Sequence, residues 1–303
     1  MHCAGRRALI HLIDASVFVF RAWFSIPPEM TAPDGTPVNA VYGYARFITD
    51  YLEDLRRRSP ADEMAVAFDE SLTTSYRNEI YPEYKANREL PPPELEQQFE
   101  HCRALTGLLG LAHYAHARYE ADDIIGTLAT RRRAAGQASV IVSRDKDLAQ
   151  LLRGADRFFN PIDRKRFGYA EIAGRYGALP EHMPDYQGLV GDKVDNIPGV
   201  PGIGAKTAGA LVGEFGTLEQ IFERLDEVTG LPIRGAGKLG ARLEEHRDAA
   251  FLSRELATIA TDMPLSIAED LTPGPPDIDG LDALFDRLGF GEALRRQVRR
   301  IAP

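Results

Sequence analysis

Three short apolar runs that each lead into an aspartate constrain the fold of this 303-residue chain more than any other feature. They cover residues 8–13, 64–68 and 139–142. Their length and continuous apolar character are typical of strands that are buried on both faces. Amphipathic helical patterns separate them, the longest over residues 39–58. Strands that alternate with helices predict a mainly parallel α/β sheet flanked by helices.

The composition changes after about residue 176, where helical segments punctuated by Gly and Pro dominate and no strand is expected. We therefore predict an α/β domain over residues 1–178 and a helical domain over residues 179–303. The Pro-rich stretches at residues 91–93 and 273–276 are expected to be loops or helix stops.

Three aspartates, Asp14, Asp69 and Asp145, follow the three predicted strands. In an open parallel sheet the carboxyl ends of the strands face one crevice, so these side chains are expected to meet there. Two carboxylates at close range repel each other by about 1 kcal/mol in water, and by several times more in a drier site. Hard divalent cations such as Mg²⁺ bind oxygen ligands and relieve this repulsion. The pattern therefore predicts a metal site.

Six further acidic residues fall where they can face the same crevice. They are Glu120, Asp122, Asp123, Asp147, Asp192 and Asp195. Each group also has an ordinary explanation, because acidic residues favour helix N-termini, turns and loops. All nine carboxylates together favour the metal interpretation, and they exceed what one ion needs. Two or more ions would suit in-line phosphoryl displacement, in which they stabilise the attacking and leaving oxygens.

The net charge of −9, taken alone, argues against nucleic acid as a partner. Setting aside nine of the 45 acidic residues leaves as many acidic residues as the 36 Lys and Arg residues, so the rest of the chain is neutral. Cys3 and Cys102 form neither a metal-type spacing nor a disulfide framework, which favours a reducing compartment. His11 and Asp14 interrupt the apolar stretch over residues 8–20, so we expect no signal peptide, no membrane span and a cytoplasmic protein.

A Gly-rich segment lies in the helical part: Gly199-Val-Pro-Gly202-Ile-Gly204-Ala-Lys206-Thr207. It is not a P-loop, because Ala205 separates Gly204 from Lys206 and no strand precedes it. We interpret it as a tight hairpin between two helices, whose backbone N–H groups can hold a phosphate beside Lys206. Such a contact grips a nucleic-acid backbone without reading bases. A purely structural turn is the alternative.

Basic and aromatic side chains alternate after the second strand, at Arg77, Tyr81, Tyr84, Lys85 and Arg88. Tyrosines can stack on bases while Lys and Arg contact phosphates, which suits single-stranded nucleic acid. Because the segment follows Asp69, it is expected to overhang the crevice. A solvated surface helix is the alternative. For the basic runs at residues 56–58, 131–133 and 295–300 we favour ordinary solvated faces.

Seven motifs occur in order over residues 9–290, and at these motifs the chain resembles the 5′-nuclease family. That family comprises the 5′→3′ exonuclease domain of bacterial DNA polymerase I, phage 5′ exonucleases and flap endonucleases. The motifs are LIDAS, VAFDE, YRNEIYPEYKANR, YEADD, SRDKD, GDKVDNIPGVPGIGAKTA and LFDRLGFG. The resemblance implies a PIN-like nuclease core with a helical arch over about residues 72–95. A helix–three-turn–helix region that binds duplex DNA would follow it.

The resemblance assigns the acidic residues to two metal sites. One would use Asp14, Asp69, Glu120, Asp122 and Asp123, and the other Asp145, Asp147, Asp192 and Asp195. It implies two or more Mg²⁺ ions, for which Mn²⁺ can substitute, and K⁺ at the Gly-rich hairpin. Lys85 and Arg88 would engage the scissile phosphate, with Arg77, Tyr81 and Tyr84 beside them. The duplex would be held by Gly199, Gly202, Gly204, Lys206 and Thr207.

The implied activity is that of a structure-specific 5′→3′ exonuclease or flap endonuclease acting on DNA near 5′ ends, flaps and nicks in replication and repair. RNA strands in RNA–DNA hybrids are also expected to be substrates. A DNA polymerase or a ligase is the expected partner, and the protein is expected to be a monomer. The chain is either a free-standing nuclease or one domain of a polymerase. Ser143-Arg144 departs from the Thr and small residue of many relatives, which adds a positive charge beside the site. A DNA-structure-binding module of the same fold, without useful catalysis, is the alternative function.

Overall fold

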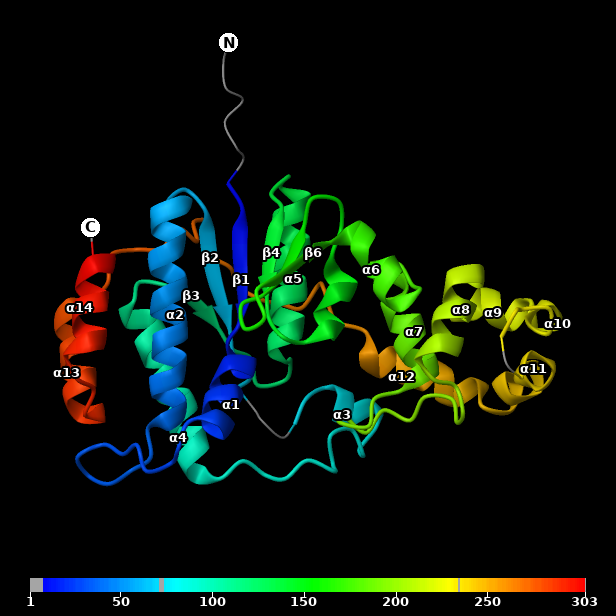
Figure 1. Cartoon of the computed structure of the whole chain (residues 1–303), viewed down its shortest axis with the longest axis horizontal. Coiled ribbons are helices and arrows are strands. Elements are labelled where there is room, and N and C mark those ends of the chain that lie inside the picture. Colours follow the sequence, from blue (N-terminus) through cyan, green and yellow to red (C-terminus); the bar gives the residue numbers. More distant parts are fainter. Residues whose placement is uncertain (1–7, 71–73, 234, 303) are drawn as a thin grey trace, which may run out of the picture.

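A six-stranded sheet forms the centre of the molecule in the computed structural model, which describes residues 8–70, 74–233 and 235–302 (Figure 1). Its strand order is β3-β2-β1-β4-β5-β6, and every neighbouring pair is parallel except β5 and β6. The strands are β1 (Ile10–Asp14), β2 (Glu63–Ala67), β3 (Ala112–Tyr114), β4 (Ser139–Val142), β5 (Arg157–Asn160) and β6 (Lys165–Gly168). The predicted mainly parallel α/β sheet is therefore confirmed.

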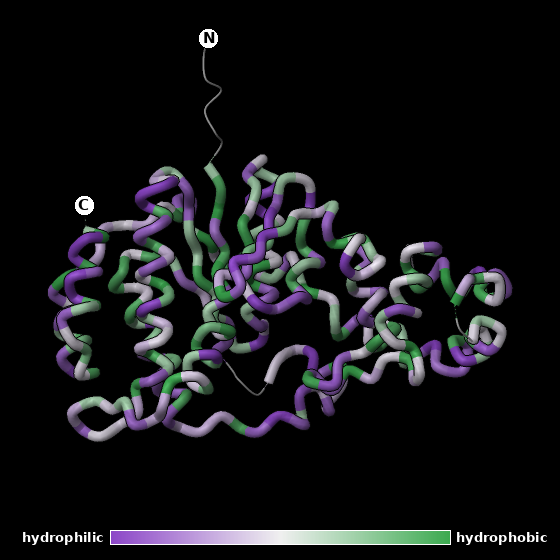
Figure 2. Tube along the Cα trace, in the orientation of Figure 1, coloured by the Kyte–Doolittle hydropathy of each residue, from purple (hydrophilic) through white to green (hydrophobic). Residues whose placement is uncertain are grey.

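Helices cover both faces of the sheet, as parallel strands require. The helices that precede β5 are α1 (Ala15–Ser25), α2 (Asn39–Arg58), α3 (Arg77–Ile80), α4 (Pro93–Leu108), α5 (Ala121–Ala134) and the 3-10 helix η1 (Lys146–Leu151). Alternate residues of β2 enter different cores, since Met64 and Val66 pack with α2 whereas Ala65 packs with α5. Most residues of the central strands β1, β2 and β4 are accordingly apolar (Figure 2).

The second half of the described chain is helical, with no strand after Gly168. Its elements are α6 (Tyr169–Tyr176), η2 (Pro180–His182), α7 (Met183–Val190), α8 (Ala205–Phe215), α9 (Leu218–Glu223), α10 (Leu225–Val228), α11 (Ala236–Glu245), α12 (Arg247–Ala257), α13 (Ile278–Leu288) and α14 (Glu292–Ile301). Figure 1 shows α6 to α11 extending away from one end of the sheet. None of the described helices is long and apolar enough to cross a bilayer.

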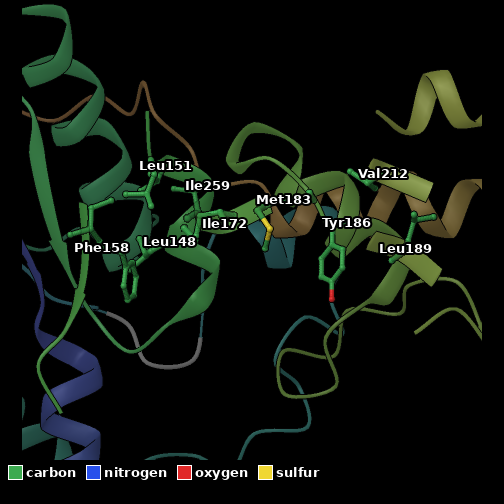
Figure 3. Close-up of a cluster of buried hydrophobic side chains, with 14 of the residues drawn as sticks. Leu148, Leu151, Phe158, Ile172, Met183, Tyr186, Leu189, Val212 and Ile259 are labelled. Atoms are coloured by element: carbon green, nitrogen blue, oxygen red, sulfur yellow. The ribbon is translucent and has the colours of Figure 1, made fainter. Parts of the chain in front are cut away.

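One hydrophobic core continues from the sheet into this helical half (Figure 3). Leu148 and Phe158 belong to the α/β part, whereas Met183 and Val212 belong to α7 and α8, and all four are buried in the same cluster. The two halves of the chain are therefore packed together rather than merely linked.

The chain returns to the sheet through residues 258–277, called the return strap below. The carbonyl oxygen of Leu271 in the strap accepts a hydrogen bond of 2.9 Å from Met64 N–H of β2. Arg131 donates to the carbonyl oxygens of Met263 and Leu265 at 3.0 and 2.7 Å. The strap delivers α13 and α14 to α4 and α2, at the opposite end of the molecule from α8 to α11 (Figure 1).

Most arginines of the basic runs are exposed, as predicted for solvated faces, namely Arg57, Arg58, Arg131, Arg296, Arg299 and Arg300. Several arginines of these runs nevertheless also bind groups within the chain. Arg131 binds the strap, Arg56 donates to the carbonyl oxygens of Ile301 and Gly274, and Arg295 forms an ion pair of 2.9 Å with Asp282. These guanidinium groups satisfy carbonyl and carboxylate oxygens within the chain, which a one-dimensional pattern of charges does not reveal.

The segment after β2 is not the helical arch that the resemblance implies. Residues 72 and 73 of the expected arch lie outside the described residues. Over residues 74–92 the only helix is α3 (Arg77–Ile80), which has four residues. Pro82 and the Pro91-Pro92 pair remove backbone donors, and Lys85 has a left-handed backbone, so a continuous helix is prevented. Residues 81–92, which are mostly hydrophilic and run between α3 and α4 (Figures 1 and 2), are called the arch segment below.

Candidate metal centre

The strand ends place three aspartates at one edge of the sheet. Asp14 ends β1, caps α1 and accepts a 2.6 Å hydrogen bond from the Ser143 hydroxyl. Ser143 Oγ in turn accepts from Asp145 N–H at 2.9 Å. Asp69 N–H donates to Ser16 Oγ at 3.0 Å. Two serine hydroxyls therefore fix the strand-end aspartates, a role that the sequence patterns did not assign to them.

The N-terminus of α5 brings further carboxylates to this edge. Ala121 N–H donates to Asp69 Oδ1 at 2.8 Å, which docks the start of the helix on the second strand-end aspartate. Glu120 is the N-cap residue, and Asp122 follows it in the first turn. Both positions favour acidic side chains because of the helix dipole, and the fold uses the same carboxylates to line the crevice.

A cavity of about 150 Å³ lies where these elements meet. Seven of the nine predicted metal ligands line it: Asp14, Asp69, Glu120, Asp122, Asp145, Asp147 and Asp195. They come from five separate stretches of sequence. Lys85 and Arg88, the cations predicted to engage a phosphate, also line the cavity, as do Arg77 and Tyr84. Phe20 lines it too, although the sequence patterns did not single it out.

Five aspartates in the cavity, Asp14, Asp69, Asp122, Asp145 and Asp147, have raised pKa values and so hold protons more tightly than ordinary carboxyls. Burial, together with the neighbouring charges of Asp69 and Asp145, raises the pKa of Asp14 to about 7. Burial and the charge of Asp145 likewise raise the pKa of Asp147 to about 7. The pKa of Asp122 is raised well above its usual value, first by burial and then by its acidic neighbours. A cation placed among these aspartates would favour their ionised form and lower their pKa values.

This donor set fits hard divalent cations. All the candidate donors are carboxylate oxygens, the ligands that Mg²⁺ and similar ions prefer. Asp147 Oδ1 is buried and has no hydrogen-bond partner in the described structure. Within residues 8–70, 74–233 and 235–302, no three acidic, His or Cys side chains already close around a single point. The acids surround a shared cavity and would have to move inward to ligate an ion.

Lys85 and Arg88 supply positive charge to the same cavity. Lys85 Nζ lies 2.6 Å from Glu120 Oε1 and 3.9 Å from Asp195 Oδ2, and Arg88 forms an ion pair with Asp195. Burial alone would raise the pKa of Glu120, but Lys85 and Arg77 outweigh it and lower the pKa. Glu120 is thus kept ionised.

Arg77 and Asp123 differ from their predicted roles. Arg77 is 2% exposed, and its guanidinium donates twice to Asp123, both at 2.9 Å, and once each to the carbonyl oxygens of Leu256 and Thr258. A fifth contact, of 3.2 Å, reaches Glu120. Arg77 is therefore not free to bind nucleic acid, which corrects the prediction.

Asp123 is fully buried and does not line the cavity. Besides Arg77, its carboxylate accepts from Glu120 N–H at 3.1 Å and from Ala260 N–H at 2.8 Å. Because both of its carboxylate oxygens accept hydrogen bonds in this way, Asp123 neutralises the buried Arg77 instead of facing a metal ion. The prediction of Asp123 as a ligand is replaced by a structural role.

The two tyrosines of the arch segment, Tyr81 and Tyr84, also differ from their predicted role of stacking on bases. Tyr84 is 4% exposed, so its ring is not available to stack on bases, and its hydroxyl donates to Glu120 Oε2 at 3.1 Å. Tyr81 is partly buried and its hydroxyl donates to Glu83 at 2.9 Å.

Asp192, a predicted metal ligand, lies outside the cavity lining. Its carboxylate is 3.8 Å from Lys146 Nζ and accepts a hydrogen bond of 2.7 Å from Val194 N–H.

The Gly-rich segment forms a turn between α7 and α8. Gly199 has a φ of 63°, and a Cβ there would lie 2.4 Å from the backbone nitrogen of Gly191, so only glycine allows the two backbones to cross. Gly204 caps α8 without a side chain, which leaves the first N–H groups of the helix open.

The residues predicted to contact phosphate lie in the turn before α8 and in its first turn. Lys206 is exposed and Thr207 half-buried in its first turn, and Gly202 is exposed in the turn before it. Lys206 lines a shallow depression of about 410 Å³ together with Arg175 and Tyr186. The two sites lie on the same molecule but are separate cavities.

Comparison with protein families matches the chain in two adjacent parts. Residues 9–177 match the family described as 5′-3′ exonuclease, N-terminal resolvase-like domain, and residues 178–279 match 5′-3′ exonuclease, C-terminal SAM fold. DNA polymerase I of Pseudomonas aeruginosa is 43% identical over 286 residues, covering 94% of this chain and 31% of that protein. DNA polymerase I of Bacillus subtilis is 39% identical over 298 residues, covering 96% and 32%. The chain thus spans about a third of the length of these relatives.

Solved structures share the fold at low sequence identity. A T5 5′-exonuclease with bound zinc superimposes with a TM-score of 0.66 at 21% identity, covering 97% of this chain and 98% of that one. The catalytic core of Rad2 in complex with DNA substrate gives a TM-score of 0.62 at 17% identity, covering 97% and 92%. The PIN-like sheet and the helical region that follows it are common to all three.

Proposed function

The chain belongs to the 5′-3′ exonuclease family, and we propose that it is a metal-dependent nuclease that hydrolyses phosphodiester bonds of DNA near 5′ ends, flaps and nicks. The observation that carries the proposal is the gathering of carboxylates from five stretches of sequence around one cavity that also holds Lys85 and Arg88. The zinc-bound 5′-exonuclease and the DNA-bound Rad2 core, which share the fold, support a metal and a nucleic-acid substrate.

Divalent cations, when bound, lower the pKa of water and stabilise the charge that develops on attacking and leaving oxygens. Asp14, Asp69, Glu120 and Asp122 would hold them on one side of the cavity. Asp145, Asp147 and Asp195 would hold them on the other, with Asp192 at the margin. Asp14, Glu120, Asp122 and Asp145 already lie at strand ends and helix starts, so these ligands need little rearrangement of the backbone.

Lys85 and Arg88 would act on the substrate. Both lie in the cavity against carboxylates, so a phosphate that enters offers them an alternative anionic partner. Their charges would then stabilise the phosphoryl oxygens as negative charge builds up in the transition state. Glu120, kept ionised by Lys85 and Arg77, remains available as a ligand.

The Gly-rich turn would hold duplex DNA through its phosphates. Open N–H groups at the start of α8 and the exposed Lys206 offer donors to a phosphate without reading bases. The arch segment would lie against the 5′ single strand through Lys85 and Arg88. Gly199, Gly202, Gly204, Lys206 and Thr207 keep this proposed role.

We propose Mg²⁺ as the resident ion, with Mn²⁺ as a substitute and K⁺ at the Gly-rich turn. RNA strands in hybrids are proposed as further substrates, and a DNA polymerase or ligase as partners of a monomeric, cytoplasmic protein. We also propose that residues 1–178 carry most of the chemistry, that residues 179–303 carry the duplex-binding surface, and that Asp192 and Asp195 of the second part complete the metal centre.

The test is digestion of an end-labelled 5′-flap duplex by the full chain with Mg²⁺ or with EDTA. Asp69→Asn is expected to abolish cleavage and to leave DNA binding near normal, because it removes a ligand charge without disturbing the duplex-binding turn. Asp163→Asn, on an exposed turn, is the matched control and should cut normally.

Retained turnover in Asp69→Asn would remove Asp69 from the proposed metal site. Binding of the flap by the unaltered chain without Mg²⁺-dependent cleavage would favour the alternative function, a DNA-structure-binding module of the same fold.

A further inference from the structure

Three hydrogen bonds join the arch segment to the loop that follows α7. Lys85 N–H donates to the carbonyl oxygen of Asp195 at 2.9 Å. Asn87 Nδ2 donates to the carbonyl oxygen of Lys193 at 2.8 Å, and Asn196 Nδ2 donates to that of Glu83 at 2.7 Å. Together these three bonds are called the arch latch. They run in both directions, so neither segment can move away without breaking all three.

The backbone is unusual on both sides of the latch. Lys85 has a φ of 58° and Asn196 a φ of 56°, both in the left-handed region that residues other than glycine rarely adopt. Within the described residues only Arg164, on the β5–β6 turn, shares this feature. Such conformations persist where surrounding contacts impose them, and they concentrate at functional sites. Here the imposed conformation directs Lys85 toward the cavity.

The latch differs in chemistry from the ion pairs beside it. Lys85 Nζ and Arg88 bind Glu120 and Asp195, carboxylates that the proposed function assigns to cations. Those ion pairs would be exchanged for other partners during a reaction cycle. The latch uses only main-chain groups and two side-chain amides, so it competes with neither cations nor phosphate. It can therefore hold the backbone of Lys85 over the cavity throughout.

We propose that Asn196 and Asn87 are positioning residues that latch the arch segment to the α7–α8 loop and thereby aim Lys85 and Arg88 into the candidate metal centre. Neither asparagine lines the cavity, so each acts through the two cations. The existence of the latch is independent of the proposed function. Its effect on cleavage rests on that function.

The latch is tested by limited trypsin digestion of the full chain in EDTA. Mass spectrometry measures the rates of cleavage after Lys85 and after Arg88. Asn196→Gly removes the amide but keeps a residue that accepts the left-handed backbone, and Asn87→Ala removes the second amide from the arch side. Each should speed these two cuts by about threefold to tenfold, the effect of losing one neutral hydrogen bond. Arg164→Gly relieves a left-handed residue outside the latch and should leave these cuts unchanged.

The positioning role is tested by single-turnover cleavage of the flap substrate and by its Kd in EDTA. Asn196→Gly and Asn87→Ala should lower the cleavage rate by about threefold or more while the Kd stays within about twofold. Unchanged trypsin cuts in both variants would show that no latch exists. Faster cuts with an unchanged cleavage rate would overturn the positioning role alone. A failed nuclease assay of the unaltered chain would count against the proposed function and leave the trypsin result standing.

Discussion

Asp14 and Asp147 ionise only at a cost to the free energy of folding when no cation is bound. Asp14 and Asp147 each have a pKa of about 7 in the folded protein, against an ordinary value of 3.8. A carboxyl whose folded pKa is raised stabilises the fold below its unfolded pKa, and this stabilisation is lost as the pH rises through the folded pKa. The window is therefore between about pH 4 and pH 7.

The metal-free protein should consequently melt at a higher temperature at about pH 5.5 than at about pH 8. Mg²⁺ should raise the Tm more at the higher pH, where its ligands are ionised. Thermal unfolding in EDTA and in Mg²⁺ measures both effects. Asp147→Asn should flatten the pH dependence in EDTA, and a Tm that rises with pH in EDTA would contradict the raised pKa values.

Lys85 is expected to matter for rate more than for binding. Its ammonium group is the cation held closest to Glu120, so it is placed to stabilise charge that develops on the phosphate. Lys85→Ala should slow single-turnover cleavage about 10²- to 10³-fold, a usual effect of removing one stabilising donor. Lys165→Ala, which breaks an exposed pair with Asp163, is the matched control. An equal loss of rate and of affinity would make Lys85 a binding residue only.

At the level of residues, the sequence predicted correctly those positions that the order and direction of the strands determine. The strand-end aspartates converge because parallel strands end at one edge, which the order of apolar runs already implies. Arg77 was misassigned because alternating basic and aromatic residues do not show which guanidinium is buried. Five donors on Arg77 find partners on segments up to 181 residues away, and no local pattern encodes that match.

At the level of elements, the Arg77–Asp123 pair fastens α3, α5 and the end of α12 to one another. Removing one partner leaves a buried charge uncompensated. Asp123→Ala should therefore lower the free energy of unfolding by about 3–5 kcal/mol. Denaturant unfolding measures the loss.

The exposed pair between Arg224 and Glu227 provides the comparison, and Glu227→Ala should change the stability little. A small loss in Asp123→Ala together with a weaker response to Mg²⁺ would instead return Asp123 to the metal site.

The elements themselves were predicted unevenly. The helix over residues 39–58 has the predicted ends, and β1, β2 and β4 lie where the apolar runs place them. The strands β3, β5 and β6 were missed because they have only three or four residues and include charged or polar side chains. The arch segment was expected to be helical, but its prolines and the latch hold it in turns.

At the level of the whole molecule, the shared hydrophobic core ties the chemistry-bearing half to the helical half. Met183 and Leu189 of α7 are buried in the same cluster as Leu148 and Ile172. A fragment of residues 1–178 would expose this surface and would also lose α13 and α14 from the face of α2. We expect the full chain to unfold in one cooperative transition and the fragment to show none. Scanning calorimetry of the full chain and of the fragment measures these transitions. A sharp transition in the fragment would contradict this expectation.

The return strap has a consequence for how the chain responds to being cut. Because residues 258–277 lead back across the sheet, the piece downstream of α11 is anchored beside α2 and α4, far from the break. A protease that nicks the backbone between α9 and α11 would divide the polypeptide in two on a denaturing gel. The same sample would still elute from a sizing column as one particle, since the severed end remains wrapped around its other fragment.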